Sequence, residues 1–315
     1  MQQDQAAGFP AGAGPAYHVP VLAGEVRQAA LEARRVVDGT LGGGGHAALF
    51  LEAGAEVLGI DRDPEAIAAA RERLGDSRIR YLEAAYDSET ALEAIREFRP
   101  DFILLDLGVS SRQLDEVARG FSFRPGAPLD MRMSGRGPTA ADLLNAASEV
   151  DLRRMFAEYG DERHAARLAR EIVRRRARAP FAVSDDLVNA IRAVLGPRSG
   201  PGDFARLFQA VRIAVNDELP ALERALPSLL DALRPGGRLA VISYHSGEDR
   251  LVKQYFSEWA RRCVCPPGLP VCRCRGRALG APEPRRPIRP GPEETEANPR
   301  ARSAILRIFR KAGQS

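Results

Sequence analysis

Residues 36–46 read Val-Val-Asp-Gly-Thr-Leu-Gly-Gly-Gly-Gly-His, and this stretch decides how we expect the chain to fold. Two β-branched residues followed by an acid predict the end of a strand, and residues 47–51 resume a helical pattern. A strand that passes into a helix through glycines lets the backbone approach a ligand closely and points helix N–H groups at it. The stretch therefore predicts a binding turn for a nucleotide-like ligand.

A second strand is expected over residues 55–61, and it ends in Asp61. This acid lies about 20 residues beyond the glycines, the spacing at which a carboxylate reaches ribose hydroxyls in a βαβ nucleotide site. Nicotinamide and flavin enzymes share the pattern, but their G-x-G-x-x-G fingerprint fits here only with an alanine in the last place. The glycine turn followed by His46 favours a nucleoside without a pyrophosphate, such as S-adenosylmethionine, over NAD and over a purely structural turn.

Strands and helices continue to alternate up to residue 108. The elements expected there are helices over 64–74 and 88–98 and strands over 79–83 and 102–108. Residues 112–217 show loops and helical stretches without a convincing buried strand, whereas residues 238–246 and 303–309 return to the sheet. This order predicts an α/β fold, a mostly parallel doubly wound sheet with an inserted all-helical domain, and a ligand at the carboxyl ends of the strands.

Several blocks of the sequence resemble the ribosomal RNA small-subunit methyltransferase H family (MraW/RsmH). The stretch from Asp38 to His46 is similar to the D-G-T-x-G-x-G-G-H signature of that family. Further blocks occur in family order at residues 105–111, 120–123, 128–133, 208–213 and 298–303. The resemblance implies a Rossmann-like class I S-adenosylmethionine-dependent methyltransferase, which modifies N4 of a cytosine in the decoding region of 16S ribosomal RNA.

The same resemblance implies a set of site residues. Those that it places at the cofactor are Gly44, Gly45, His46, Asp61, Tyr86, Asp106 and Gln113. Asp38 is expected to orient the glycine turn. His245, Ser246 and the loop over residues 128–133 are candidates for the pocket of the target base and for catalysis. Next to them the sequence departs from the family pattern, because Tyr244 and Gly247 replace the usual Phe and Leu.

Asp106 admits two interpretations. Cytosine N4 is a poor nucleophile because its lone pair is delocalised into the ring, and a hydrogen-bond acceptor on the amine would localise that pair. At the carboxyl end of its strand, Asp106 could be this acceptor, which makes it a catalytic candidate. The alternative is that Asp106 only binds the amine of the cofactor's methionine part.

The chain is expected to have a tail and two domains. Residues 1–17 predict a disordered tail, residues 18–112 and 217–315 an S-adenosylmethionine-binding methyltransferase domain, and residues 113–216 an inserted helical RNA-recognition domain. No run of about 18 apolar residues occurs, so no membrane span is expected. The N-terminus also lacks the basic start and apolar run of a signal peptide. We therefore expect a cytoplasmic protein with no membrane partner.

Positive charge gathers in two places. Residues 261–311 hold twelve arginines and one lysine against four glutamates, a net charge of +9 in a chain whose total is +4. An expected helix over residues 161–179 carries a row of arginines spaced three or four apart, namely Arg163, Arg167, Arg170, Arg174 and Arg178. Such spacing places them on one face of a helix, where either a solvated surface or a contact with RNA phosphates is compatible with the pattern.

All four cysteines fall within twelve residues in a C-x-C-x6-C-x-C pattern, at Cys263, Cys265, Cys272 and Cys274. Two C-x-C pairs could form a tetrahedral thiolate site for zinc with a structural role. This spacing differs from that of the common C-x2-C ribbons. An unmetallated thiol-rich loop and a disulfide pair are the alternatives, and the family signature does not decide among them.

The leading function is thus an RNA methyltransferase whose partner is 16S rRNA within the small ribosomal subunit. An NAD-dependent oxidoreductase and a non-catalytic ribosome-assembly factor with a vestigial cofactor pocket are the alternatives. The sequence leaves open whether naked RNA or the assembled subunit is the substrate, and whether the chain forms a homodimer.

Overall fold

The computed structural model describes residues 20–266, 271 and 273–313 of the 315-residue chain, so the expected tail over residues 1–17 and Cys272 lie outside the described residues. In this part of the chain, one sheet has the strand order β3-β2-β1-β4-β5-β7-β6. Its strands are β1 (Arg35–Asp38), β2 (Glu56–Asp61), β3 (Ile79–Glu83), β4 (Phe102–Asp106), β5 (Arg238–Ser243), β6 (Gly280–Pro282) and β7 (Ile305–Lys311).

The sheet is mostly parallel. Strands β1 to β5 pair in parallel, and β7 runs antiparallel between β5 and the short edge strand β6. The predicted α/β fold with a doubly wound, mostly parallel sheet is confirmed. Strand β6 was not expected from the sequence, because three residues that include a glycine and a proline carry almost no strand signal.

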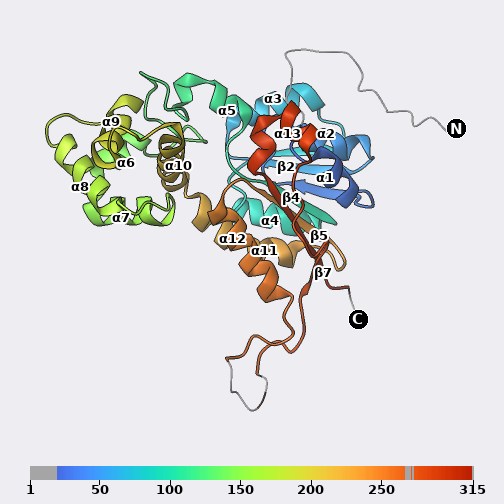
Figure 1. The fold of residues 1–315 in the computed structure, drawn as a ribbon. Coiled ribbons are helices and arrows are strands. Elements are labelled where there is room, and N and C mark those ends of the chain that lie inside the picture. The colour runs from blue at the N-terminus through green and yellow to red at the C-terminus, as the bar shows by residue number, and fades with distance from the viewer. Residues whose placement is uncertain (1–19, 267–270, 272, 314–315) are drawn as a thin grey trace.

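Helices cover both faces of the sheet (Figure 1). They are α1 (Ala23–Ala29), α2 (Gly45–Glu52), α3 (Pro64–Leu74), α4 (Glu89–Phe98), α11 (Glu218–Ala232) and α12 (Ser246–Trp259). Along β4, Ile103 and Leu105 face the core beneath α4, α11 and α12, whereas Phe102 and Leu104 face the core beneath α1 and α2. Because every second residue points to the same face, a strand buried on both faces must be apolar throughout, as β4 is.

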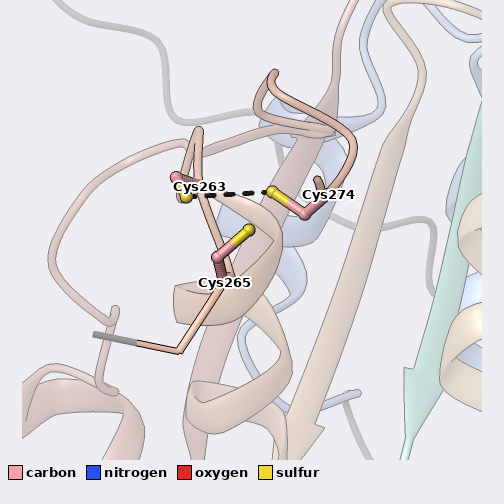
Figure 2. A group of neighbouring side chains, drawn as sticks. All are labelled: Cys263, Cys265 and Cys274. Carbon is pink, nitrogen blue, oxygen red and sulfur yellow. Dashed lines mark hydrogen bonds between the residues drawn. The ribbon is translucent and has the colours of Figure 1, made fainter. Parts of the chain in front are cut away.

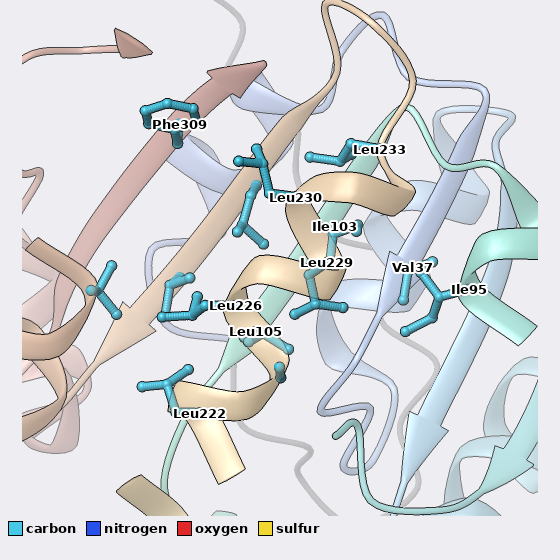
Figure 3. Close-up of a cluster of buried hydrophobic side chains, with 14 of the residues drawn as sticks. Val37, Ile95, Ile103, Leu105, Leu222, Leu226, Leu229, Leu230, Leu233 and Phe309 are labelled. Atoms are coloured by element: carbon cyan, nitrogen blue, oxygen red, sulfur yellow. The ribbon is translucent and has the colours of Figure 1, made fainter. Parts of the chain in front are cut away.

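Helix α11 supplies much of the first core (Figure 3). Leu222, Leu226, Leu229 and Leu230 are buried and recur every three or four residues, which places them on one side of the helix. They pack over the central strands of the sheet with Phe309 of β7. This packing ties the segment after the helical region back to the sheet.

Between β4 and β5 the chain forms helices that gather beside the sheet (Figure 1). They are α5 (Ser111–Asp115), η1 (Val117–Arg119), α6 (Ala140–Ala146), α7 (Glu149–Glu158), α8 (Ala165–Arg176), α9 (Ser184–Leu195) and α10 (Pro201–Asn216). Helices α6 to α10 share a buried core that is separate from the two cores of the sheet. These helices therefore pack mainly against one another and not against the sheet.

The arginine row occupies a shorter helix than the sequence predicts. Helix α8 ends at Arg176 and begins at Ala165, so Arg163 and Arg178 fall outside it. Arg167, Arg170 and Arg174 remain on its exposed side, and Leu168 and Ile172 are buried on the other, as expected. Glu162 lies in the loop that precedes the helix. Its buried carboxylate forms an ion pair with Arg206 and accepts the backbone N–H of His164.

The C-terminal segment returns over the start of the chain. Helix α13 (Pro292–Ala297) presents Glu294, whose carboxylate accepts the backbone N–H of Leu22 at 2.6 Å. The short helix η2 (Pro299–Ser303) carries Arg300, which pairs with Asp115 of α5. Among the described residues, we found no helix with the length and apolar character needed to cross a lipid bilayer.

We predict that Leu226→Ala lowers the free energy of unfolding by about 2–5 kcal/mol, because it opens a cavity in the core beneath α11. The matched control is Val150→Ala, whose side chain is 75% exposed and which should change that free energy by less than about 0.5 kcal/mol. Urea unfolding followed by circular dichroism measures both. Equal effects of the two substitutions would contradict the packing described here.

Candidate active site

Three acidic residues end three neighbouring strands of the sheet. Asp38 closes β1, Asp61 closes β2 and Asp106 closes β4, and β1 lies between the other two. Because the three strands are parallel, these carboxyl groups meet at the same edge. The glycine turn begins at this edge, directly after Asp38. The structure therefore brings together the turn and both strand-end acids that the sequence singled out.

Asp61 holds the glycine turn in place. One of its carboxylate oxygens accepts the N–H of Gly42 at 2.8 Å, and the other accepts the N–H of Asp63 at 2.9 Å. Burial raises the pKa of Asp61, and these two hydrogen bonds act against that rise. Each oxygen keeps a further lone pair, so the carboxylate could still accept a hydrogen bond from a ligand hydroxyl.

Gly44 is required by the turn for two reasons. Its φ is +75°, in the region that favours glycine, and it directly precedes α2 as the N-cap residue. A Cβ at this position would also lie 2.6 Å from Cδ1 of Leu74 in α3. The turn thus packs closely against α3, and Gly45 opens α2 with its N–H groups directed toward the same edge.

Asp38 is buried beneath this edge, with 1% of its surface exposed. Burial raises its pKa to about 7, and the nearby charges of Asp106 and Asp61 add to the rise. His46 and the N–H of Thr40, which lies 3.3 Å from Oδ1 of Asp38, act in the opposite direction. Asp38 is therefore a structural acid under the turn, in keeping with the orienting role expected for it.

The side chain of Asp106 is partly accessible, 23% exposed. Its Oδ1 accepts the hydroxyl of Tyr244 at 2.8 Å, and its backbone N–H donates to Oγ1 of Thr40 at 2.6 Å. Its Oδ2 lies 3.5 Å from Nε2 of His46. Burial and, after it, the charge of Asp106 raise the pKa of Tyr244. The hydroxyl therefore stays protonated and donates a hydrogen bond to the carboxylate.

His46 is buried against Asp106, yet neither of its ring nitrogens has a hydrogen-bond partner among the described residues. Buried polar atoms are normally paired, because an unpaired one costs about 1–3 kcal/mol. A polar ligand at the carboxyl edge would supply the missing partner. This is the feature of the structure that points most directly to a bound small molecule.

His245 and Ser246 stand at the start of α12. Nδ1 of His245 accepts the N–H of Glu248 at 3.4 Å, and its Nε2 lies 3.2 Å from the carboxylate of that residue. Burial alone would raise the pKa of Glu248, but His245, the N–H of Tyr244 and Arg212 together hold it below its usual range. The histidine is thus occupied in capping the helix, and Ser246 is the first residue of α12.

The remaining predicted cofactor residues have different surroundings. Tyr86 packs against the core beside the sheet, and a Cβ at Gly39 would lie 3.7 Å from its Cβ, so it borders the first residue of the turn. Burial raises the pKa of Tyr86. Gln113 is buried, and its amide donates to Asp63, the N-cap of α3, at 2.9 Å. Gln113 therefore joins α5 to the sheet region.

Sequence reasoning missed two residues that fix the loop over residues 128–133. Arg119 donates to the carboxylate of Asp63 and to the carbonyl oxygens of Arg132 and Met133. Asn216, at the end of α10, accepts the N–H of Met133 and donates to the carbonyl oxygen of Met131. Arg119 directly precedes the family-like block at residues 120–123, and Asn216 follows the block at residues 208–213 by three positions. Their closeness to these blocks was the signal in the sequence that could have identified them.

Two hollows lie elsewhere in the described part of the chain. One of about 360 Å³ opens within the helical region near Arg163 and Arg206. Another of about 810 Å³ lies at the amino ends of β1 and β2, beside Arg35, Glu56 and Arg234. In a parallel sheet the ligand lies at the carboxyl ends of the strands, so the chemistry of the edge identifies the candidate site better than volume does.

Comparisons with known proteins agree with one another. The model of the MraW methylase family matches residues 15–312. Ribosomal RNA small subunit methyltransferase H of Gemmatimonas aurantiaca is 59% identical over 96% of this chain and 98% of its own length. The proteins of that name from Heliobacterium mobile and Rubrobacter xylanophilus are each 48% identical over 94% of this chain, and over 99% and 97% of their own lengths.

We predict that Asp38→Asn makes the protein more stable above pH 7. The folded-state pKa, about 7, lies above the ordinary value of 3.8, so the wild type loses stability as the pH rises between these values. An asparagine carries no charge to bury, and the gain at pH 8 is at most about 4 kcal/mol.

Urea unfolding of the wild type and the variant at pH 5 and pH 8 measures this difference. The control is Asp76→Asn, which makes the same chemical change at an exposed side chain and should leave the pH dependence unaltered. A destabilised Asp38→Asn at pH 8 would show that the buried carboxylate is stabilising and that burial is not the dominant influence on it.

Proposed function

Because the chain belongs to the MraW methylase family, we propose that it transfers a methyl group from S-adenosylmethionine to N4 of a cytosine in the decoding region of small-subunit ribosomal RNA. The observation that carries this proposal is the 59% identity with a ribosomal RNA small subunit methyltransferase H over almost the whole of both chains. The predicted class I methyltransferase fold, with its mostly parallel seven-stranded sheet in the described residues, accords with it.

The carboxyl edge offers suitable groups for this cofactor. Bound S-adenosylmethionine supplies a methyl group that its sulfonium has already activated. The glycine turn lies at this edge, and Asp61 has lone pairs for ribose hydroxyls. The ring nitrogens of His46 provide polar contacts for the methionine part. An oxidoreductase is less well supported, since its pyrophosphate fingerprint is incomplete.

Asp106 is the residue that we propose to contact the reacting amine. Oδ1 is held by Tyr244, so Oδ2 remains on the side of His46 to accept a hydrogen bond from cytosine N4. That bond would concentrate the lone pair on N4 and stabilise the positive charge that develops there. Positioning adds to this, because correct alignment of the reacting groups can be worth about 7–11 kcal/mol.

The RNA is proposed to lie across the helical region and the carboxyl edge, and to be 16S rRNA within the small ribosomal subunit. A base inside folded RNA must leave its stack to reach the methyl group. The loop over residues 128–133 borders the edge and is fixed by Arg119 and Asn216, so it is suited to line the base pocket. All candidate residues come from one chain, and the reaction does not require a homodimer.

The test is methylation of small subunits that lack this modification, with labelled S-adenosylmethionine and mass mapping of the RNA. We expect N4-methylcytosine with the wild type and at least a ~100-fold lower kcat with Asp106→Asn, at similar affinity for the cofactor. The control is Tyr244→Phe, which restores the family's usual residue, leaves the carboxylate in place and should keep most of the activity.

Three results would contradict parts of this proposal. Binding of S-adenosylmethionine without any methylation would favour the non-catalytic assembly factor. Binding of NAD instead would favour the oxidoreductase. If Asp106→Asn loses affinity for the cofactor but keeps its kcat at saturation, Asp106 binds the cofactor and does not assist the reaction.

We further predict that Arg167→Gln combined with Arg170→Gln weakens the salt dependence of RNA binding. Both side chains are exposed on α8, where Arg174 is already paired with Glu171. Helix α8 lies on the side of the helical region away from the sheet, so it would meet RNA beyond the target base (Figure 1).

Loss of two phosphate contacts should reduce the slope of log K against log salt by about 1.5. Filter binding between 50 mM and 200 mM salt measures that slope. The control pair, Arg27→Gln with Arg96→Gln, removes the same charge from exposed positions on α1 and α4. If both pairs change the slope equally, the α8 arginines are a solvated surface.

A further inference from the structure

We propose that the thiol groups of Cys263, Cys265 and Cys274 bind a zinc ion. Their Sγ atoms all lie within 4.8 Å of one another and point toward a common centre (Figure 2). Cys263 and Cys265 lie in the stretch that follows α12, and Cys274 lies in the stretch that leads back to β6. The site would therefore join the two sides of a segment that extends away from the sheet (Figure 1).

The spacing of the sulfur atoms fits a metal better than a disulfide. Cys263 and Cys274 have Sγ atoms 3.8 Å apart. A disulfide requires about 2.05 Å. Four sulfurs placed tetrahedrally at about 2.3 Å from zinc are about 3.8 Å from one another, which matches the observed separation. Two neutral thiols can also meet at this distance, but a third thiol beside them indicates a shared ligand.

Backbone donors already point at two of the sulfur atoms. The N–H of Val264 donates to Sγ of Cys274 at 3.3 Å, and the N–H of Arg273 donates to Sγ of Cys265 at 3.4 Å. Each donor comes from the side opposite to its acceptor, so the two sides are reciprocally linked. Hydrogen bonds of this kind orient metal-bound thiolates and offset their negative charge.

Side-chain burial contributes little to the shape of this segment. None of the described residues between 260 and 279 is buried. At its base, the guanidinium of Arg275 donates to the carbonyl oxygens of Glu258 and Arg261, and the N–H of Leu279 donates to the carbonyl oxygen of Trp259. Beyond this base the described residues of the segment form no apolar core, and small units without a core are commonly held by a metal or disulfides.

Zinc is the ion that these donors favour. Thiolates are soft ligands, and sites made of cysteines in a tetrahedral arrangement select zinc. The fourth position is left to water or to another donor. Such a site would be structural: it would fix a segment that carries Arg261, Arg262 and Arg277 on its exposed surface.

The proposal does not depend on methyl transfer, and metal content tests it directly. We expect the full chain, purified under reducing conditions, to hold about one zinc per molecule, and cobalt in its place to give the intense visible bands of tetrahedral thiolate coordination. Cys263→Ser and Cys274→Ser should each reduce the zinc content at least ~10-fold. The matched control is Val271→Ser, an exposed residue of the same segment that has no ligand atom, and it should retain the metal.

Two further measurements keep a misfolded variant from being mistaken for support. Binding of S-adenosylmethionine should be the same in the wild type and in each cysteine variant, because the carboxyl edge lies elsewhere. A chelator should make trypsin cleave the wild type faster at the arginines between 261 and 277, because the segment loses its fixed shape, and added zinc should slow that cleavage. A metal-free wild type whose thiols all react with a thiol reagent, or which forms a disulfide in this segment, would overturn the proposal.

Discussion

The site depends on the carboxylate of Asp61 and the backbone N–H of Gly42, which are joined at 2.8 Å. This bond ties the middle of the glycine turn to the end of the neighbouring strand, so the turn cannot move away from the sheet. The backbone conformation at Gly42 and Gly44 is one that other residues seldom adopt. The strand order then places Asp38 and Asp106 beside the turn, because β1 pairs with both β2 and β4.

Three acids at one edge repel one another, and the protein accommodates this in different ways. Burial raises the pKa of Asp38 to about 7, so this carboxyl is only partly ionised near neutral pH. Asp61 is held by two backbone N–H groups. Asp106 accepts the Tyr244 hydroxyl and stays partly exposed. The edge can therefore offer a carboxylate to a ligand without carrying three full negative charges in a poorly solvated place.

The helical region has a core of its own, and polar contacts fix it against this edge. Gln113 and Arg119 both donate to Asp63, the residue that caps α3 immediately after β2. At the other end, Arg62 donates to the carbonyl oxygen of Asn216, where α10 gives way to α11. The residues proposed to bind the cofactor and those proposed to meet the RNA are thus held by a shared set of hydrogen bonds. A substitution that breaks these hydrogen bonds at either end of the helical region should therefore shift the groups at the carboxyl edge.

Sequence patterns alone were enough to predict the alternation of strands and helices, the glycine turn after Val36 and Val37, and the positions of Asp61 and Asp106 at strand ends. These features depend on neighbours within a few residues, which local patterns record. The capping of α12 by His245 joins residues three positions apart, and the sequence analysis missed it because histidine is not one of the usual N-cap residues. The hydrogen bond from Tyr244 to Asp106 could not be anticipated, because the two residues are 138 positions apart and meet only when β5 pairs with β4, which no local pattern encodes.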